Sequence, residues 1–233
     1  MAAVAQFYVT YIGPVIRVGM ALFAILVLWV ALWRAGFASK ARVLGFVSTA
    51  LLLVWWVATD QLGRSGFYPP NWSVMRSVGW IIAIAGLIPL LRSQTMGAAL
   101  DTIPAWWLVA VQLYRFGGGV VWLVQWSAGR LPDAFGLTAG IGDCLVGVIA
   151  VIAAIWLYSG VRGGSVVAVA WNVLGILDFA TGFVLASFFP YTVPYPAVMI
   201  PAFSAPLSLI FHGLSLRQLS RAIGGTRPCK TPA

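Results

Sequence analysis

Long, uninterrupted apolar runs make up most of the chain, and polar residues gather in the short stretches between them. The runs cover approximately residues 13–33, 43–61, 77–91, 103–126, 137–159, 164–189 and 197–217. A helix crosses a bilayer with about 20 mainly apolar residues, whereas the strands of a membrane barrel alternate apolar and polar positions. Because these seven runs do not alternate, we predict an all-α fold, a polytopic membrane helical bundle with seven transmembrane helices.

The third run is the shortest of the seven. Only 15 residues separate Arg76 from Arg92, and Pro89 lies near the end of the run. We still expect a span here, because arginine side chains at helix ends can reach out of the hydrocarbon layer. Pro201 and Pro206 in the last run are expected to be tolerated, since neighbouring helices can satisfy the backbone groups that proline frees.

Composition supports lipid as the main surrounding of the chain. Hydrophobic residues make up 61% of the 233 residues and charged residues 8%, with a mean hydropathy of +0.97. Soluble domains carry about 25% charged residues, so this chain has too little polar surface to coat a water-soluble globule. We expect one transmembrane domain over residues 1–219, followed by a basic cytoplasmic tail over 220–233, with membrane lipids as partners.

The distribution of basic residues predicts how the bundle is oriented across the membrane. The first, third and fifth connections and the tail hold nine of the 14 Lys and Arg residues: Arg34, Lys40, Arg42, Arg92, Arg162, Arg217, Arg221, Arg227 and Lys230. The other connections hold three, Arg64, Arg76 and Arg130. By the positive-inside rule the N-terminus lies outside and the C-terminus in the cytoplasm. The net charge of +9 is thereby explained without a nucleic-acid partner. No Lys or Arg precedes Arg17, so a cleavable signal peptide with a basic first segment is not expected.

The chain lacks the residues that several kinds of catalytic or metal site require. The chain has one histidine, no glutamate and two cysteines at separate depths, so no multi-histidine or Cys/His metal spacing exists. No lysine falls within a run to hold retinal, and the motifs of metal-dependent or Ser/His/Asp membrane enzymes are absent. We therefore do not expect an enzyme. The residues leave the cofactor undetermined, with bound lipid or pigment as the open alternatives.

Three charged residues fall inside the fourth, fifth and sixth runs, where charge is costly and often functional. Arg115 and Asp178 lie roughly 18 Å and 21 Å above the cytoplasmic edge at helical rise. Asp143 lies roughly 9 Å below the outer edge of a core about 30 Å thick, so we expect all three at one level. One arginine cannot neutralise two carboxylates, and the second could hold a proton. The cluster either locks three helices together or binds a ligand or proton.

Other polar groups lie near this level. Gln112 precedes Arg115 by three residues and shares its helix face. Asn172 and His212 are expected in the cytoplasmic half of the bundle, where His212 could form an interhelical hydrogen bond, transfer a proton or ligate a haem or chlorophyll. The run Gly117–Gly119 favours a bend, a break or a very close approach of two helices.

Four segments carry a resemblance: IPAWWLVAVQLYRFGG (103–118), AFGLTAGIGDCLVGVIA (134–150), AWNVLGILDFATG (170–182) and IPAFSAPLSLIFHGLSLRQL (200–219). Over roughly residues 100–220 the chain resembles a widespread group of small bacterial membrane proteins with no assigned function. The features that this group shares stand here as Arg115, Asp143, Asn172, Asp178 and His212. The resemblance implies a bacterial inner-membrane location and no mechanism.

Three functions follow from these patterns. The first is proton-linked or small-molecule transport or binding at Arg115, Asp143 and Asp178, with Gln112, Asn172 and His212 as further candidates. The second is a non-catalytic accessory subunit of a larger membrane complex, associated with pigment, quinone or lipid and with other membrane subunits. A lipid-modifying membrane enzyme is the least supported of the three.

Overall fold

Every regular element is a helix in the part of the chain that the computed structural model describes, residues 7–68, 72–188 and 193–224, with only the backbone at 72–76. The elements in chain order are the π-helical turn η1 (Tyr8–Ile12), α2 (Gly13–Arg34), α3 (Ser39–Arg64), α4 (Trp72–Arg92), α5 (Gln94–Leu100), α6 (Ala105–Ala110), the 3-10 turn η3 (Val111–Leu113), α7 (Tyr114–Ser127), α8 (Asp133–Tyr158), α9 (Gly164–Phe188), the π-helical turn η4 (Ile200–Ser204) and α10 (Ala205–Ile223). The prediction of an all-α fold is confirmed.

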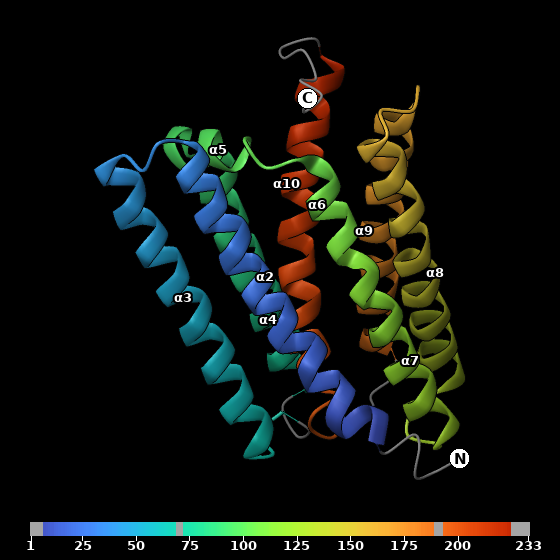
Figure 1. Cartoon of the computed structure of the whole chain (residues 1–233). Coiled ribbons are helices and arrows are strands. Elements are labelled where there is room, and N and C mark those ends of the chain that lie inside the picture. Colours follow the sequence, from blue (N-terminus) through green and yellow to red (C-terminus); the bar gives the residue numbers. More distant parts are fainter. Residues whose placement is uncertain (1–6, 69–71, 189–192, 225–233) are drawn as a thin grey trace.

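The long helices have the length and composition of membrane spans. Five segments are long and apolar enough to cross a bilayer: Tyr8–Arg34, Ser39–Arg64, Ala105–Ser127, Asp133–Tyr158 and Gly164–Phe188. If α4 and α5 together count as one bent span, the described residues contain six candidate spans. The long helices lie side by side with similar axis directions, while α5 lies across one end of the bundle (Figure 1). Such an assembly of apolar helices indicates a membrane protein.

The third apolar run ends in a sharp turn of the backbone. α4 stops at Arg92, and α5 leaves it at an angle of 91°. The last carbonyl groups of a helix have no partner within it, and here Arg217 of α10 donates to the carbonyl oxygens of Leu90, at 3.3 Å, and of Leu91. The Ser93 hydroxyl then accepts a hydrogen bond from the Met96 amide at 3.0 Å and caps α5. An arginine distant in sequence thus stabilises the bend.

α10 lies within the bundle and packs against α4, α6 and α9. Its buried residues include Ser208, His212 and Ser215, whose polar groups can bond to other helices because protein rather than lipid surrounds them. This composition explains why α10 is absent from the five apolar segments, although η4 and α10 together extend from Ile200 to Ile223. Residues 225–233, most of the predicted tail, lie outside the described chain.

α7 and α8 approach each other closely through glycines. A Cβ atom at Gly119 would lie 2.5 Å from the Gly140 carbonyl oxygen and 2.7 Å from the Cys144 amide nitrogen. The backbones can therefore come this near only without a side chain at that position. α7 is continuous through the three glycines, so Gly117–Gly119 do not break the helix, and Gly119 provides the close approach that was one of the three alternatives.

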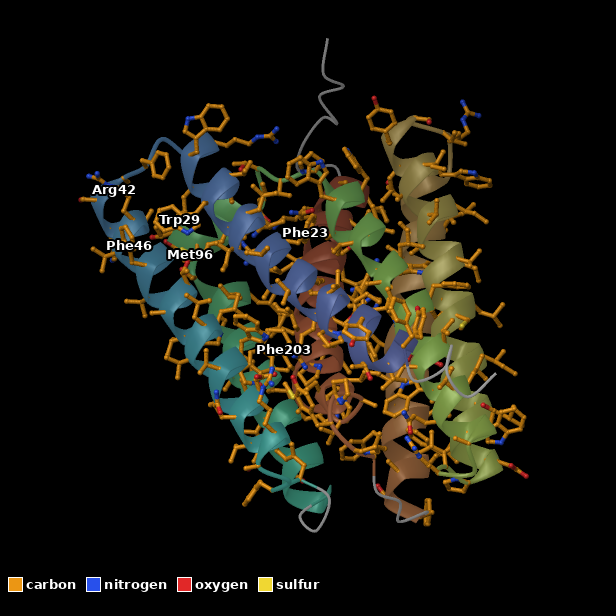
Figure 2. The ribbon with its side chains drawn as sticks, turned by 60° about the horizontal axis from the view of Figure 1, so that its bottom comes forward. Phe23, Trp29, Arg42, Phe46, Met96 and Phe203 are labelled. Carbon is orange, nitrogen blue, oxygen red and sulfur yellow. The ribbon has the colours of Figure 1, made fainter. Side chains whose placement is uncertain are left out.

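The outer surface of the bundle is apolar. Phe46 and Leu51 on α3 are about two-thirds exposed, at 63% and 64%. By contrast, Phe203 of η4 is fully buried and its ring centroid lies 4.8 Å from that of Trp55. Figure 2 places Phe46 on the flank of α3 and Phe203 within the bundle. Exposed apolar side chains of this size suit contact with lipid tails.

Candidate functional site

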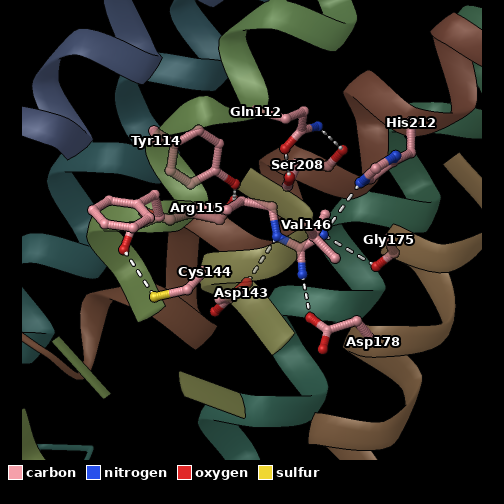
Figure 3. Close-up of polar contacts among 12 residues, drawn as sticks. Gln112, Tyr114, Arg115, Asp143, Cys144, Val146, Gly175, Asp178, Ser208 and His212 are labelled. Carbon is pink, nitrogen blue, oxygen red and sulfur yellow. Dashed lines mark hydrogen bonds and ion pairs between the residues drawn. The ribbon is translucent and has the colours of Figure 1, made fainter. Parts of the chain in front are cut away.

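Arg115 is the centre of a charged cluster that joins α7, α8 and α9. Its side chain is 1% exposed. The Nε atom donates to Asp143 Oδ1 at 2.7 Å, and Nη2 donates to Asp178 Oδ2. Nη1 donates to the Gly175 carbonyl oxygen at 3.2 Å, and all these contacts are visible in Figure 3. The planar guanidinium uses its several donors to hold two carboxylates from different helices at once.

The cluster carries more negative than positive charge when both carboxylates are ionised. The Asp143 and Asp178 side chains are 10% and 15% exposed, and one guanidinium serves both. The Phe179 ring covers the guanidinium, with its centroid 3.9 Å from Arg115 Cζ, which adds a favourable contact between a cation and an aromatic face. Three buried charges therefore give a net charge of −1, unless one carboxylate takes up a proton.

His212 of α10 contacts the cluster through the Nη1 atom of Arg115. Its Nε2 lies 3.5 Å from Arg115 Nη1, and its Nδ1 lies 2.9 Å from Asn172 Oδ1. Asn172 donates through Nδ2 to the Ala168 carbonyl at 2.7 Å and to the Ser215 hydroxyl at 3.1 Å, so its Oδ1 is the acceptor. Because a guanidinium only donates, Nε2 has to be the unprotonated nitrogen. The contacts select neutral His212 with its proton on Nδ1.

Gln112 belongs to a separate pair despite its closeness to Arg115 in sequence. It lies in the turn η3, where its Nε2 donates to the Ser208 carbonyl at 3.2 Å and its Oε1 accepts from the Ser208 hydroxyl. Arg115, Asp143, Asp178, Asn172 and His212 form one connected network; Gln112 bonds beside it to α10. The sequence predicts His212 below the charged level, and the long Arg115 side chain nevertheless brings its Nη1 within 3.5 Å of His212 Nε2.

Two cavities adjoin the cluster. The first measures about 30 Å³ and is lined by both Arg17 and Arg115, together with Asp143. The second measures about 70 Å³ and is lined by Asp143 and Asp178 but not by Arg115. Each carboxylate thus faces open space as well as the guanidinium.

A second buried ion pair was not among the predicted site residues. Arg17 of α2 is 4% exposed, and its Nη2 lies 2.8 Å from Asp60 Oδ1 of α3. The Tyr195 hydroxyl donates to the same oxygen at 3.1 Å, and Arg64 Nε lies 2.6 Å from Asp60 Oδ2. A comparison of depths would have found the pair, because Arg17 opens the first run and Asp60 closes the second.

The third ion cluster lies at the end of α10. Arg217 holds Asp101 with Nε and Nη2, both at 3.2 Å, and Arg221 pairs with the same carboxylate. The sequence pattern indicates Arg217 and Arg221 only as cations on the cytoplasmic side, without this partner. In the described part of the chain, no group of three His, Cys, Asp or Glu side chains is arranged to hold a metal ion.

Comparison with known proteins gives a family but no activity. Residues 70–220 match the family described as "Domain of unknown function (DUF8737)". Neither the curated proteins nor the solved structures contain a match to the chain. The match begins earlier than the resemblance over roughly 100–220 suggested, so it also includes α4 and α5. It covers more than half of the chain and contains the whole Arg115 network. The chain belongs to the DUF8737 family, a family of unknown function.

Proposed function

We propose that this chain is a seven-pass membrane protein that binds and exchanges a proton at Arg115, Asp143 and Asp178, linked to the binding or transport of a small molecule. The observation that carries the proposal is one buried guanidinium shared by two carboxylates that both face a cavity. The resemblance to small bacterial membrane proteins implies a bacterial inner membrane as the location. The basic residues favour an orientation with the N-terminus outside and the C-terminus in the cytoplasm.

Seven crossings follow when α4 and α10 are added to the five apolar segments. α4 has 21 residues and α10 with η4 has 24, from Ile200 to Ile223. At a rise of about 1.5 Å per residue, either can cross a core of about 30 Å. α10 can do so despite its polar residues because those groups bond to neighbouring helices.

The physical case for proton exchange is electrostatic. A charge without a partner in an apolar interior is costly, and two neighbouring carboxylates disfavour each other's ionisation. Arg115 offsets the charge of one carboxylate. A proton on the other makes the cluster neutral, while its removal restores a net charge of −1. The two forms differ in charge, so each attracts a different ligand.

If the protein is instead an accessory subunit, the same contacts have only a structural role. The pairs of Arg115 with Asp143 and Asp178 would then only lock α7, α8 and α9 together. This alternative predicts that neutral substitutions lower stability without abolishing any proton movement. A lipid-modifying activity has no supporting group of residues in the described site.

Proton uptake by reconstituted protein tests the proposal. Proteoliposomes containing Asp178→Asn are expected to lose most of the proton uptake that the unaltered protein shows, because the amide keeps the shape but cannot bind a proton. Asp133→Asn is the matched control: Asp133 lies on α8 like Asp143 but is exposed and accepts from Trp126 Nε1 at 2.7 Å. Equal uptake by Asp178→Asn and Asp133→Asn would reject this site.

A further inference from the structure

The second cavity combines aromatic walls with two carboxylates. Its lining includes the rings of Trp80, Trp122, Phe179 and Phe183 and the carboxylates of Asp143 and Asp178. These side chains come from α4, α7, α8 and α9, which are far apart along the chain. The Trp80 ring meets Phe183 edge to face at 5.7 Å between centroids and Phe179 at 6.3 Å. The tertiary structure thus builds one aromatic wall from α4 and α9.

The electrostatic character of this cavity is negative. Aromatic faces carry partial negative charge and attract cations, and the two carboxylates, which share Arg115, add a net charge of −1 when both are ionised. The described lining holds no Lys, Arg or His side chain. Arg115 lines the first cavity and not the second. A positively charged ligand is therefore the class that this surface favours.

We propose that the second cavity binds a small primary or secondary alkylammonium group, with its N–H groups directed to Asp143 and Asp178 and its carbon atoms against the aromatic rings. This inference rests on the proposed function, because the same carboxylates exchange the proton. The cluster with one proton and the cluster with one bound ammonium have the same net charge. Binding of one ammonium ion therefore releases one proton, and charge is balanced in the exchange.

The size of the cavity admits a small ligand. One water molecule needs about 10–15 Å³ of such cavity volume, so a cavity of about 70 Å³ has room for a small ammonium group and its first carbon atoms. Methylammonium and dimethylammonium fit this volume. The ammonium can come from a free amine or from the head of an aminolipid, which present the same chemistry.

Calorimetry with methylammonium chloride tests the site in protein held in phosphatidylcholine nanodiscs, whose lipids carry no net charge and no N–H group. We expect saturable binding, no binding of methanol as the neutral analogue, and the release of about one proton per ion, read from buffers of different ionisation enthalpy. Trp80→Leu removes one aromatic wall and leaves both carboxylates in place. It should weaken binding by about threefold to thirtyfold, the range of one cation–π contact.

Matched variants separate the site from general stability. Trp106→Leu removes a tryptophan that packs on Tyr158 away from the cavity, and it should bind methylammonium as the unaltered protein does. If Trp80→Leu fails to fold, Phe183→Leu serves the same purpose on the facing helix. Equal affinity in Trp80→Leu, or in its replacement Phe183→Leu, and in Trp106→Leu would overturn the aromatic site.

Failure of this inference is distinguishable from failure of the proposed function. Loss of proton uptake in Asp178→Asn without methylammonium binding to the unaltered protein would reject the ammonium site and leave proton exchange standing. Methylammonium binding without proton release would support the site and reject the exchange. Weaker methylammonium binding in phosphatidylethanolamine nanodiscs than in phosphatidylcholine nanodiscs, which have the same net charge but no N–H group, would identify the lipid head as an occupant, and equal binding would favour a free amine.

Discussion

At the scale of single residues, Arg115 determines how the interior charges coexist. Removing one partner of a buried charged group costs more than the intact pair contributes, because the remaining charge stays desolvated. Arg115 has two such partners, Asp143 and Asp178, and both would remain without it. The stability of the cluster therefore depends on the balance of charges more than on any one hydrogen bond.

Arg115→Gln is expected to lower the free energy of unfolding by about 3 kcal/mol, because two carboxylates are left without a cation. The triple variant Arg115→Gln/Asp143→Asn/Asp178→Asn should recover most of this loss, since it contains no buried charge. Thermal unfolding in detergent measures both. A triple variant no more stable than Arg115→Gln would show that packing, and not charge balance, explains the loss.

At the scale of elements, small residues set the distance between α7 and α8. Gly119 faces the Gly140 carbonyl, whereas a Cβ atom at Gly118 would meet its nearest heavy atom, Asp143 Oδ2, at 3.9 Å. Two adjacent glycines on one helix thus have different roles. The close approach also brings Asp143 of α8 within reach of Arg115 of α7.

Gly119→Ala is expected to destabilise the protein by about 2 kcal/mol, because the added methyl group overlaps the α8 backbone, which cannot shift cheaply. Gly118→Ala is the matched control and should change stability little, since its methyl group meets an ordinary contact distance. Melting temperatures of the two variants measure the difference. Similar melting temperatures would mean that α8 moves aside freely, contrary to the tight packing of the two backbones.

At the scale of the whole molecule, the number and direction of crossings can be tested with cysteines. In a Cys144→Ala/Cys229→Ala background, we expect a membrane-impermeant maleimide to label Ser65→Cys in intact cells, and to label Ser39→Cys and Gly224→Cys only after lysis. Ser39 and Ser65 lie at opposite ends of α3. In the proposed seven-pass topology, α4 and α10 provide two of the five crossings between Ser65 and Gly224. Labelling of Gly224→Cys in intact cells would leave an even number of crossings there. The bent pair of α4 and α5 would then be the first candidate for a segment that re-enters without crossing.

The sequence by itself determined the helical class, the positions of the long helices and the charges held among them. In lipid, long apolar runs satisfy the hydrogen bonds of their backbone by forming helices. This is why α2, α3, α8 and α9 match the predicted runs closely. The charges Arg115, Asp143 and Asp178 could be assigned to one level because helical rise converts sequence position into depth.

The tertiary structure alone decided which groups meet around each helix. The depth of a residue does not specify the side of the helix on which its side chain lies. The sequence therefore could not show that Phe179 covers Arg115 or that Gln112 bonds to Ser208. It also could not show that Arg217 bonds to the end of α4. The aromatic cavity beside Asp178 also exists only after four helices pack together. Contacts between helices depend on their rotation and neighbours, and a linear pattern of apolar residues does not specify either.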